Sequence, residues 1–372
     1  MPLIIDSGRE GGRIPTRWAE KGLPRSTPSR ANHLEGGQCI SIALVNNMPD
    51  PALEDTEMQF FELLDIASGD VPVVVKLYSL PGVPRTDRGK RHLNSFYFDF
   101  ADLWNIRFDG VIITGTEPLQ SNLQDEPYWS TLTELFDWAK ENTSSTVLSC
   151  LAAHASVLHG DGIPRHRLPD KQFGVFDSAR KCDHSLTSRI SESSRIADRI
   201  RFPHSRWNEV RANELSSCGY MVLTESAEAG VDLFVKKNKK SLFVHFQGHP
   251  EYGAQTLLKE YRRDIKRFLR AERDTYPTMP AGYFDAASIQ RLNDFRKTAI
   301  SDRREDVAAS FPEEAVVGGL QNSWHSSAAS VYRNWLQYLE SRKTETPVFA
   351  AMARSAGTRS TMVDSEAAQK AL

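Results

Sequence analysis

The chain has 372 residues, of which 40% are hydrophobic, so it can bury the core of one large α/β domain or of two ordinary ones. Its 46 basic and 48 acidic residues nearly balance, which argues against a nucleic-acid partner. No run approaches the roughly 18 consecutive apolar residues of a membrane-spanning helix, which argues against a membrane partner.

The two ends of the chain differ in composition from its middle. Residues 1–36 are rich in Gly, Pro, Arg and Ser and predict a flexible or loosely attached arm, and residues 344–372 predict a flexible tail. Residues 37–343 contain no Pro/Ser linker, so we expect them to form a single domain. Near the N-terminus the charges follow a very short apolar run, the reverse of a secretory signal, which predicts a cytoplasmic protein.

Apolar strands alternate with helical patterns along the first half of the domain. In chain order, we expect a strand at 39–46, a helix at 54–66, a strand at 71–78, a helix around 96–104, a strand at 109–114, a helix at 129–142, a strand at 146–150 and a helix at 151–159. This alternation predicts an α/β fold of three layers, with a mostly parallel sheet covered by helices on both faces.

The second half of the domain mixes strands with longer helices. We expect a strand near 220–223, a hairpin of strands at 232–235 and 241–246, a long helix at about 254–271 and a closing helix at about 326–339. The sequence KKNKK supplies the turn of the hairpin.

The chain has four cysteines, widely spaced and without a CxxC pair, so neither a disulfide framework nor a zinc cluster is expected. Cys150 differs from the others because it stands between a predicted strand and a predicted helix. A nucleophile on such a corner is exposed above the sheet, and the N–H of the next residue, Leu151, can bind an oxyanion. The competing interpretation is a small buried hydrophobic residue.

A candidate base for Cys150 lies in the segment FVHFQGHPEYG. His249 follows a strand and a glycine, and Glu251 comes two residues later. In an extended turn both side chains can line one side, where the carboxylate orients the imidazole and stabilises its charged form. The alternative is a turn at the end of a strand with a solvated histidine.

Together these motifs resemble the homoserine O-succinyltransferases, the acyltransferases of methionine biosynthesis with a class I glutamine amidotransferase-like fold. The resemblance covers about residues 40–339 and is carried by IALVNNMPD, DGVIITGTEPL, the cysteine corner, PHSRWNEV, EAGVDLFV, GHPEYGAQTLLKEYRRD and NWLQYL, in that order. It implies a reaction in which an acyl group passes from succinyl-CoA to homoserine through a cysteine thioester, without a bound cofactor or metal. It also makes a homodimer an expectation, with residues 324–339 contributing.

The resemblance assigns roles to individual residues. Cys150 matches the acyl-carrying cysteine, His249 the catalytic base and Glu251 its partner. The matching substrate-binding residues are Lys171, Ser205 and Arg263.

Helical periodicity alone places Arg263 opposite the apolar face of its helix, on the solvent side. A binding role for Arg263 therefore requires another segment to cover that face, and the region around Trp324 is the candidate.

Several positions depart from the family pattern. Leu151 and Ala152 replace a common Trp-Gly pair, and His154 replaces a common glutamine. His154 has two interpretations, as a packed histidine or as a second proton carrier. In the segment GTEPL, the position that discriminates acyl donors falls near Leu119, and Glu117 can occupy similar space. An acetyl donor therefore stays open.

Three alternatives to the main interpretation remain at this level. The same Cys-His-Glu set serves hydrolases and amidotransferases, and the fold also suits a binding protein without turnover. Serine is homoserine less one methylene, and one methylene is worth only about 1–3 kcal/mol of discrimination.

Overall fold

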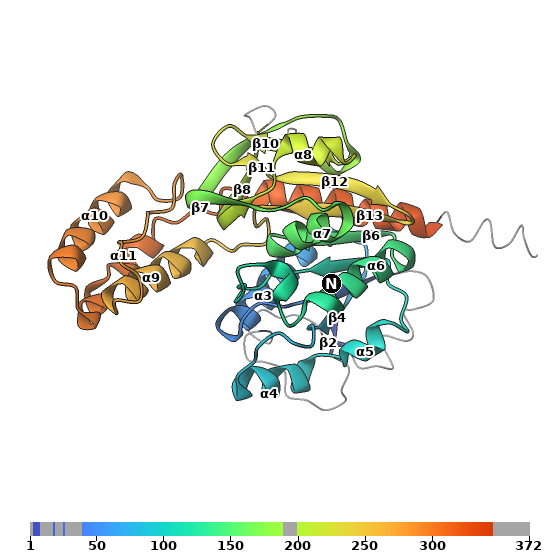
Figure 1. Ribbon diagram of the computed structural model, residues 1–372, viewed down its shortest axis with the longest axis horizontal. Coiled ribbons are helices and arrows are strands. Elements are labelled where there is room, and N and C mark those ends of the chain that lie inside the picture. The colour runs from blue at the N-terminus through green and yellow to red at the C-terminus, as the bar shows by residue number, and fades with distance from the viewer. Residues whose placement is uncertain (1–2, 8–17, 19–24, 27–38, 189–198, 345–372) are drawn as a thin grey trace, which may run out of the picture.

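The structure is a computed structural model, and it describes the chain except for residues 1–2, 8–17, 19–24, 27–38, 189–198 and 345–372 (Figure 1). Nearly all of the expected C-terminal tail and most of the expected N-terminal arm lie outside the described residues. Within the arm, Leu3–Asp6 forms strand β1, which pairs in parallel with β4. This part of the segment is therefore attached to the central sheet.

The central sheet contains nine of the described strands. The first seven are joined by parallel pairings, and the last two pairings, of β12 with β13 and of β12 with β9, are antiparallel. In spatial order the strands are β2 (Arg25–Ser26), β1 (Leu3–Asp6), β4 (Val73–Tyr78), β3 (Ile40–Val45), β5 (Gly110–Ile113), β6 (Ser145–Ser149), β13 (Ser241–Phe246), β12 (Leu233–Asn238) and β9 (Met221–Val222). The predicted mostly parallel α/β fold is thus confirmed.

Helices cover both faces of this sheet, because successive side chains of its strands point to opposite sides. On one face, Ile112 and Val147 pack with α3 (Asp50–Ser68) and with the closing helix at residues 325–344. On the other face, Val111 and Leu148 pack with α6 (Trp129–Asn142) and α7 (Leu151–Asp161). The two cores meet only through the sheet, which gives the three predicted layers.

A second, antiparallel sheet lies beside the first, in the order β11 (Gly230–Val231), β10 (Thr224–Ser226), β7 (His166–Arg180) and β8 (Arg199–Glu209). The short helix α8 (Ala212–Ser217) follows β8. Strands β7 and β8 were not expected. Most of the first half of β7 is not buried, and the register shifts between Arg167 and Gln172, so the sequence lacks a steady alternation of apolar and polar residues.

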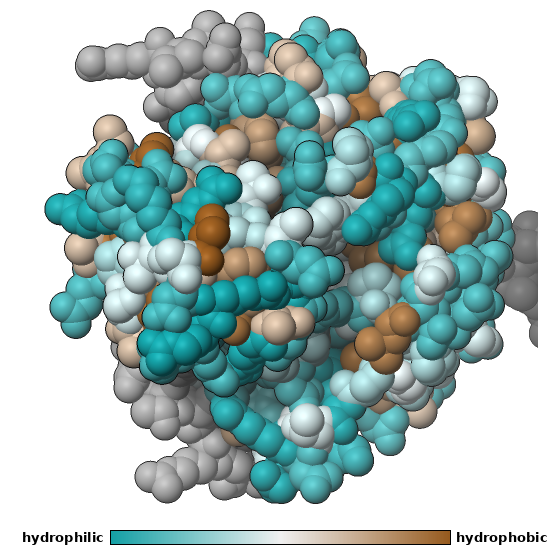
Figure 2. Space-filling model, turned by 60° about the vertical axis from the view of Figure 1, so that its left-hand side comes forward, coloured by the Kyte–Doolittle hydropathy of each residue, from teal (hydrophilic) through white to brown (hydrophobic). Residues whose placement is uncertain are grey.

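A small helical lobe stands at one end of the molecule (Figure 1). It is built from α9 (Thr256–Leu269), α10 (Ala286–Ser301), η4 (Glu305–Ser310) and α11 (Glu313–Val317), around a core of its own that includes Tyr261, Phe295 and Trp324. The face that Figure 2 turns forward is mostly hydrophilic, with hydrophobic side chains exposed singly. No helix among the described residues is long and apolar enough to cross a membrane.

The remaining strands and helices expected from the sequence agree with the structure except around residues 96–104. The β12–β13 hairpin forms as expected, with Asn238 opposite Ser241 and the turn at Lys239 and Lys240. Instead of one helix at 96–104, two helices flank an extended link: α4 (Asp87–Phe96) and α5 (Phe100–Leu103). Helix α4 buries only Gly89 fully, so it carries little apolar periodicity, whereas its Thr86 cap is a local polar signal.

Candidate active site

Cys150 occupies a strained corner between a strand and a helix. Strand β6 ends at Ser149 and helix α7 begins at Leu151, and Cys150 between them has φ 52° and ψ −107°. A positive φ is costly for a residue with a side chain, and such strain persists only where the surrounding structure holds it. Here the Cys150 N–H donates to the Phe246 carbonyl at 2.8 Å, and its carbonyl accepts from His154 N–H at 3.2 Å. The half-buried thiol is therefore fixed above the carboxyl end of the sheet.

The backbone after Cys150 supplies an anion site. Leu151 is the first residue of α7, where an N–H has no partner within its helix and the helix dipole favours negative charge. Gly115, just after β5, lies against it: a Cβ at residue 115 would be 3.0 Å from Leu151 N and 3.4 Å from the Ser149 carbonyl oxygen. Only glycine leaves the space beside this N–H open. The sequence reasoning named Leu151 but missed Gly115.

His249 and Glu251 meet Cys150 at this corner. His249 follows β13, the strand next to β6, and its N–H donates to the Pro203 carbonyl at 2.8 Å. Its Nδ1 lies 2.8 Å from Glu251 Oε1, which also accepts from Ser149 Oγ at 3.1 Å. Both side chains are more than nine-tenths buried. The structure thus brings Cys150 together with His249 and Glu251, which are far from it in the chain.

The charges at this corner favour a protonated His249. Burial by itself lowers the pKa of His249, but the Glu251 carboxylate and the Cys150 sulfur, each also hydrogen-bonded to the imidazole, outweigh burial and raise it well above its usual value. A buried carboxylate opposite the ring has this effect because it stabilises the charged form. The arrangement therefore favours the imidazolium form of His249 beside the Cys150 sulfur.

Behind His249 lies a buried polar cluster of His204, Arg206 and Asp232. Burial raises the pKa of Asp232 to about 6, although its Oδ1 accepts from Gly248 N–H at 2.9 Å. Burial lowers the pKa of His204, and the Arg206 charge adds to this effect, so His204 is neutral. A Cβ at residue 248 would come within 2.8 Å of Asp232 Oδ1, so the glycine before His249 is required by close packing.

His154 is a packed residue in this structure. It is buried, and its Nε2 donates to Gln247 Oε1 at 2.9 Å, an oxygen that also accepts from Val210 N–H. Burial lowers the pKa of His154 to about 3, so the ring carries no charge at neutral pH. These contacts agree with the interpretation as a packed histidine rather than as a second proton carrier.

The predicted substrate-binding residues converge on two carboxylates of α9. Lys171 Nζ, from β7, lies 3.2 Å from both Glu260 and Asp264. Ser205, from β8, donates a hydrogen bond to Glu260, and Arg263 Nε donates to Asp264 at 3.0 Å. Burial alone would raise the pKa of Glu260, but Lys171, Ser205 and other partners outweigh it and lower the pKa, so the carboxylate is charged.

Tyr252 joins this cluster to the catalytic corner. Its ring stacks on the His249 ring with centroids 4.2 Å apart, and its hydroxyl donates to Glu260 Oε1 at 2.6 Å. Glu260, Asp264 and Tyr252 were missed by the sequence reasoning. All three lie inside the motif GHPEYGAQTLLKEYRRD, but only the contacts across the fold show that they line the site.

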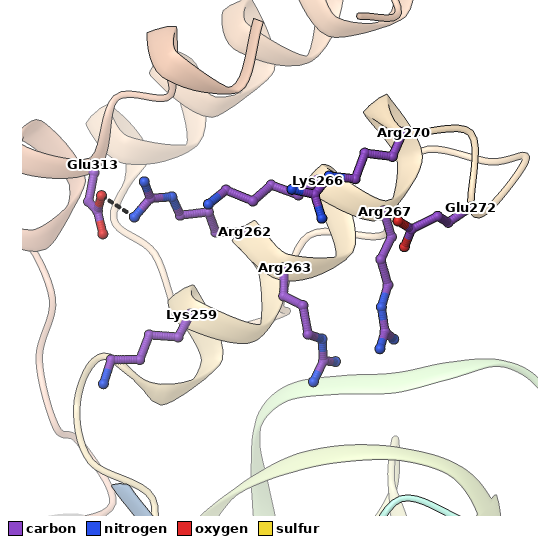
Figure 3. Close-up of a pocket in the computed structure, with 8 residues that line it drawn as sticks. All are labelled: Lys259, Arg262, Arg263, Lys266, Arg267, Arg270, Glu272 and Glu313. Atoms are coloured by element: carbon purple, nitrogen blue, oxygen red, sulfur yellow. Dashed lines mark hydrogen bonds and ion pairs between the residues drawn. The ribbon is translucent and has the colours of Figure 1, made fainter. Parts of the chain in front are cut away.

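The Arg263 side chain is 47% exposed, and the neighbours it has are not the ones expected. Trp324 is buried in the helical lobe, with its indole N–H donating to the Tyr252 carbonyl. The neighbours of Arg263 are instead Glu260, Asp264 and, at longer range, Glu117. Figure 3 shows Arg263 and Arg267 pointing the same way from α9. The region around Trp324 is therefore not the cover of Arg263.

The loop after β5 separates the two proposed donor-specificity residues. Glu117 Oε1 lies 3.5 Å from the Arg267 guanidinium, so this side chain reaches α9. Leu119 is 64% exposed, and its N–H donates to Glu126 Oε1 at 2.6 Å. The loop thus turns Glu117 toward the helix that carries Arg263.

In the described part of the chain, no three His, Cys, Asp or Glu side chains are grouped as metal ligands would be.

Comparisons with known proteins identify relatives over most of the chain. The family model for homoserine O-succinyltransferase matches residues 21–346. A homoserine O-succinyltransferase of Rhodopseudomonas palustris is 45% identical over 302 residues, which cover 81% of this chain and 89% of that protein. Another, of Methylococcus capsulatus, is 40% identical over 341 residues, covering 90% and 92%. Among solved structures, a glutamine amido transferase from Methylobacillus Flagellatus aligns with a TM-score of 0.46 and 15% identity over 81% of this chain and 95% of that chain.

Proposed function

Because the chain belongs to the homoserine O-succinyltransferase family of acyltransferases, we propose that it transfers the succinyl group of succinyl-CoA to the hydroxyl of homoserine, with Cys150 as the nucleophile. The observation that carries this proposal is the contact of Cys150, His249 and Glu251 at the carboxyl end of the sheet. The reaction belongs to methionine biosynthesis, and a cytoplasmic location is part of this proposal.

The first half of the reaction acylates Cys150. The thiolate attacks the thioester carbonyl carbon of succinyl-CoA, and the oxygen gains a negative charge beside Leu151 N–H. When the tetrahedral intermediate collapses, the bond to the CoA sulfur breaks, and His249 gives its proton to that sulfur. The products are succinyl-Cys150, free CoA and a neutral imidazole. One thioester replaces another, so this step is close to balanced in energy.

The second half returns the site to its starting state. Neutral His249 takes the proton of the homoserine hydroxyl while the oxygen attacks the acyl carbon. The bond to Cys150 Sγ then breaks, which restores the thiolate and the imidazolium together. Glu251, buried against His249, stabilises that charge in both halves.

The cluster on α9 suits the amino-acid end of homoserine. Homoserine carries an ammonium and a carboxylate on one carbon. Lys171 and Arg263 supply cations for the carboxylate, and Glu260 and Asp264 supply anions for the ammonium. Tyr252 connects this cluster to His249, which places the acceptor's head group one ring away from the base. Ser205 fixes the orientation of Glu260.

Glu117 and the dimer complete the proposal. We keep Glu117 as the residue of the 115–119 loop that influences the choice of acyl donor, because its carboxylate lies 3.5 Å from the Arg267 guanidinium of α9. Both side chains are exposed, Glu117 at 56% and Leu119 at 64%. A homodimer stays a prediction. Trp324, Trp335 and Leu339 are buried within their own chain, so their apolar side chains do not provide its interface.

Intact-protein mass spectrometry tests the mechanism. Mixing the protein with succinyl-CoA alone should add one succinyl group, and homoserine should remove it. The Cys150→Ala variant should show neither the adduct nor turnover, and Cys218→Ala, at a half-buried cysteine near the surface, is the matched control that should behave as wild type. Turnover without an adduct, or full activity of Cys150→Ala, would reject the thioester mechanism.

The same measurement identifies the two substrates. An adduct from acetyl-CoA and none from succinyl-CoA would show that the acyl donor is acetyl-CoA. Removal of the acyl group by serine but not by homoserine would show that the acceptor is serine.

A further inference from the structure

Helix α9 carries an unusual concentration of positive charge. A pocket of about 360 Å³ lies along it and is lined by six cations, Lys259, Arg262, Arg263, Lys266, Arg267 and Arg270, together with Glu272 and Glu313 (Figure 3). We call these six residues the cationic face of α9. The chain as a whole has a formal net charge of −2, so the charge is local to this helix and not a property of the whole surface.

This arrangement costs stability. Lys259 and Arg263, Arg263 and Arg267, and Lys266 and Arg270 are each four residues apart on the helix surface, and like charges at this spacing destabilise a helix by about 0.2–0.5 kcal/mol per pair.

Acidic neighbours compensate part of this repulsion. Arg262 pairs with Glu313, Arg270 with Glu305 at 2.6 Å, Lys259 with Asp55 at 2.5 Å and Arg267 with Glu117 at 3.5 Å. Lys266 has no carboxylate partner among the described residues. A set of like charges that is only partly compensated suits an anionic ligand.

The cationic face begins at the proposed active site. Its inner members, Arg263 and Arg267, contact Asp264 of the substrate cluster and Glu117 of the loop after β5. Glu117 is two residues from Gly115, which lies against the amide that follows Cys150. From chain geometry, the Arg267 guanidinium is therefore within about 20 Å of Leu151 N.

The acyl donor has its own charge at about this distance from its reacting atom. In CoA, the chain between the sulfur and the first phosphorus has about 13 bonds and reaches roughly 15 Å when extended. Beyond it come a diphosphate and the 3′-phosphate of the adenosine, which arginine and lysine bind through charge-assisted hydrogen bonds. A donor with its thioester at Cys150 can therefore place its phosphates on the outer part of the cationic face.

We propose that the cationic face of α9 is the binding site for the phosphates of the CoA part of the acyl donor, with Lys266 and Arg270 as its outer contacts. This inference rests on the proposed function and adds to it the location of the nucleotide end of the donor. Lys266 is the best single probe, because replacing it breaks no ion pair of the described structure.

Binding of adenosine 3′,5′-bisphosphate and of CoA, measured by titration calorimetry, tests the site without requiring turnover. We expect both Lys266→Glu and the double variant Lys266→Ala/Arg270→Ala to weaken the binding of both probes by about tenfold or more. This is the effect of losing one or two charge-assisted hydrogen bonds. Arg291→Ala/Lys297→Ala, which removes two cations from the exposed face of α10, is the matched control and should bind both probes as wild type does. The ratio of kcat/KM for succinyl-CoA to that for succinyl-pantetheine, which lacks the phosphates, should fall by a similar factor in the α9 variants.

The outcomes separate this inference from the proposed function. If wild type forms the succinyl adduct, but the α9 variants bind both probes as tightly as wild type does, the phosphate site is elsewhere. If inorganic phosphate competes as strongly as CoA, the face is a general anion site and the inference fails. If wild type forms no adduct at all, the proposed function fails, whereas weaker binding of the bisphosphate by Lys266→Glu would still support the site.

Discussion

Replacing Gly115 with alanine tests the oxyanion site directly. Gly115 does not have a positive φ, so alanine fits its backbone without strain. The added Cβ would lie 3.0 Å from Leu151 N and equally close to Leu151 Cβ. It therefore enters the space that an oxyanion needs in order to accept a hydrogen bond from Leu151.

The expected loss follows from the contribution of a single oxyanion donor. Losing one such donor costs enzymes about 100- to 1000-fold in kcat. Because the Leu151 amide and the new methyl group can each yield by a few tenths of an ångström, we expect a fall in kcat of about 100-fold. The KM for homoserine should change little, because the site proposed for its head group is the α9 cluster, on the far side of Tyr252.

The assay follows CoA release with a thiol reagent, together with urea unfolding of each variant. Gly160→Ala is the matched control, because a Cβ at residue 160 meets only the Tyr220 hydroxyl, at 3.9 Å. It lies in the last turn of α7, where alanine is favoured over glycine by about 0.5–1 kcal/mol, so this variant should be slightly more stable and fully active.

A Gly115→Ala variant that keeps wild-type kcat, with its fold intact, would show that Leu151 N–H does not bind the oxyanion. A large loss of stability with kcat unchanged per folded molecule would point instead to simple crowding between the loop after β5 and α7.

Two further changes probe the base and the acceptor site. Glu251→Gln removes the carboxylate that raises the pKa of His249, so the imidazolium gives up its proton at lower pH. In the pH profile of acyl-enzyme formation, the fall in rate on the alkaline side should therefore move to lower pH. An unchanged profile would contradict the pairing of Glu251 with His249. Arg263→Lys keeps the positive charge but loses the planar guanidinium group that can bind a carboxylate through two hydrogen bonds. At low homoserine concentration, the rate at which homoserine removes the acyl group from the enzyme should fall about tenfold, and it should fall more than the rate of acylation does. The control Arg291→Lys should change neither rate, and equal losses in both steps would argue against an acceptor site at Arg263.

Local patterns in the sequence predicted the layers of this protein and the corner that carries Cys150. Buried parallel strands are short apolar runs, and the helices between them show their own period, so β3, β5, β6 and α6 were each visible without the rest of the chain. His249 and Glu251 were found in the same way, because a histidine and a carboxylate two residues apart after a strand form a local motif. The resemblance to a family added roles to these positions.

Only the tertiary structure decided what surrounds that corner. Lys171 and Ser205 come from β7 and β8, strands whose mixed polarity hides them from a sequence pattern, and they meet Glu260 across 89 and 55 residues of chain. Helical periodicity described Arg263 as a solvated arginine, and in the folded chain its side chain is indeed 47% exposed. What the periodicity could not show is that the fold brings Lys171 and Glu117 to the carboxylates and arginines beside it, because contacts between distant segments depend on the packing of whole elements and leave no periodic signal in any one of them.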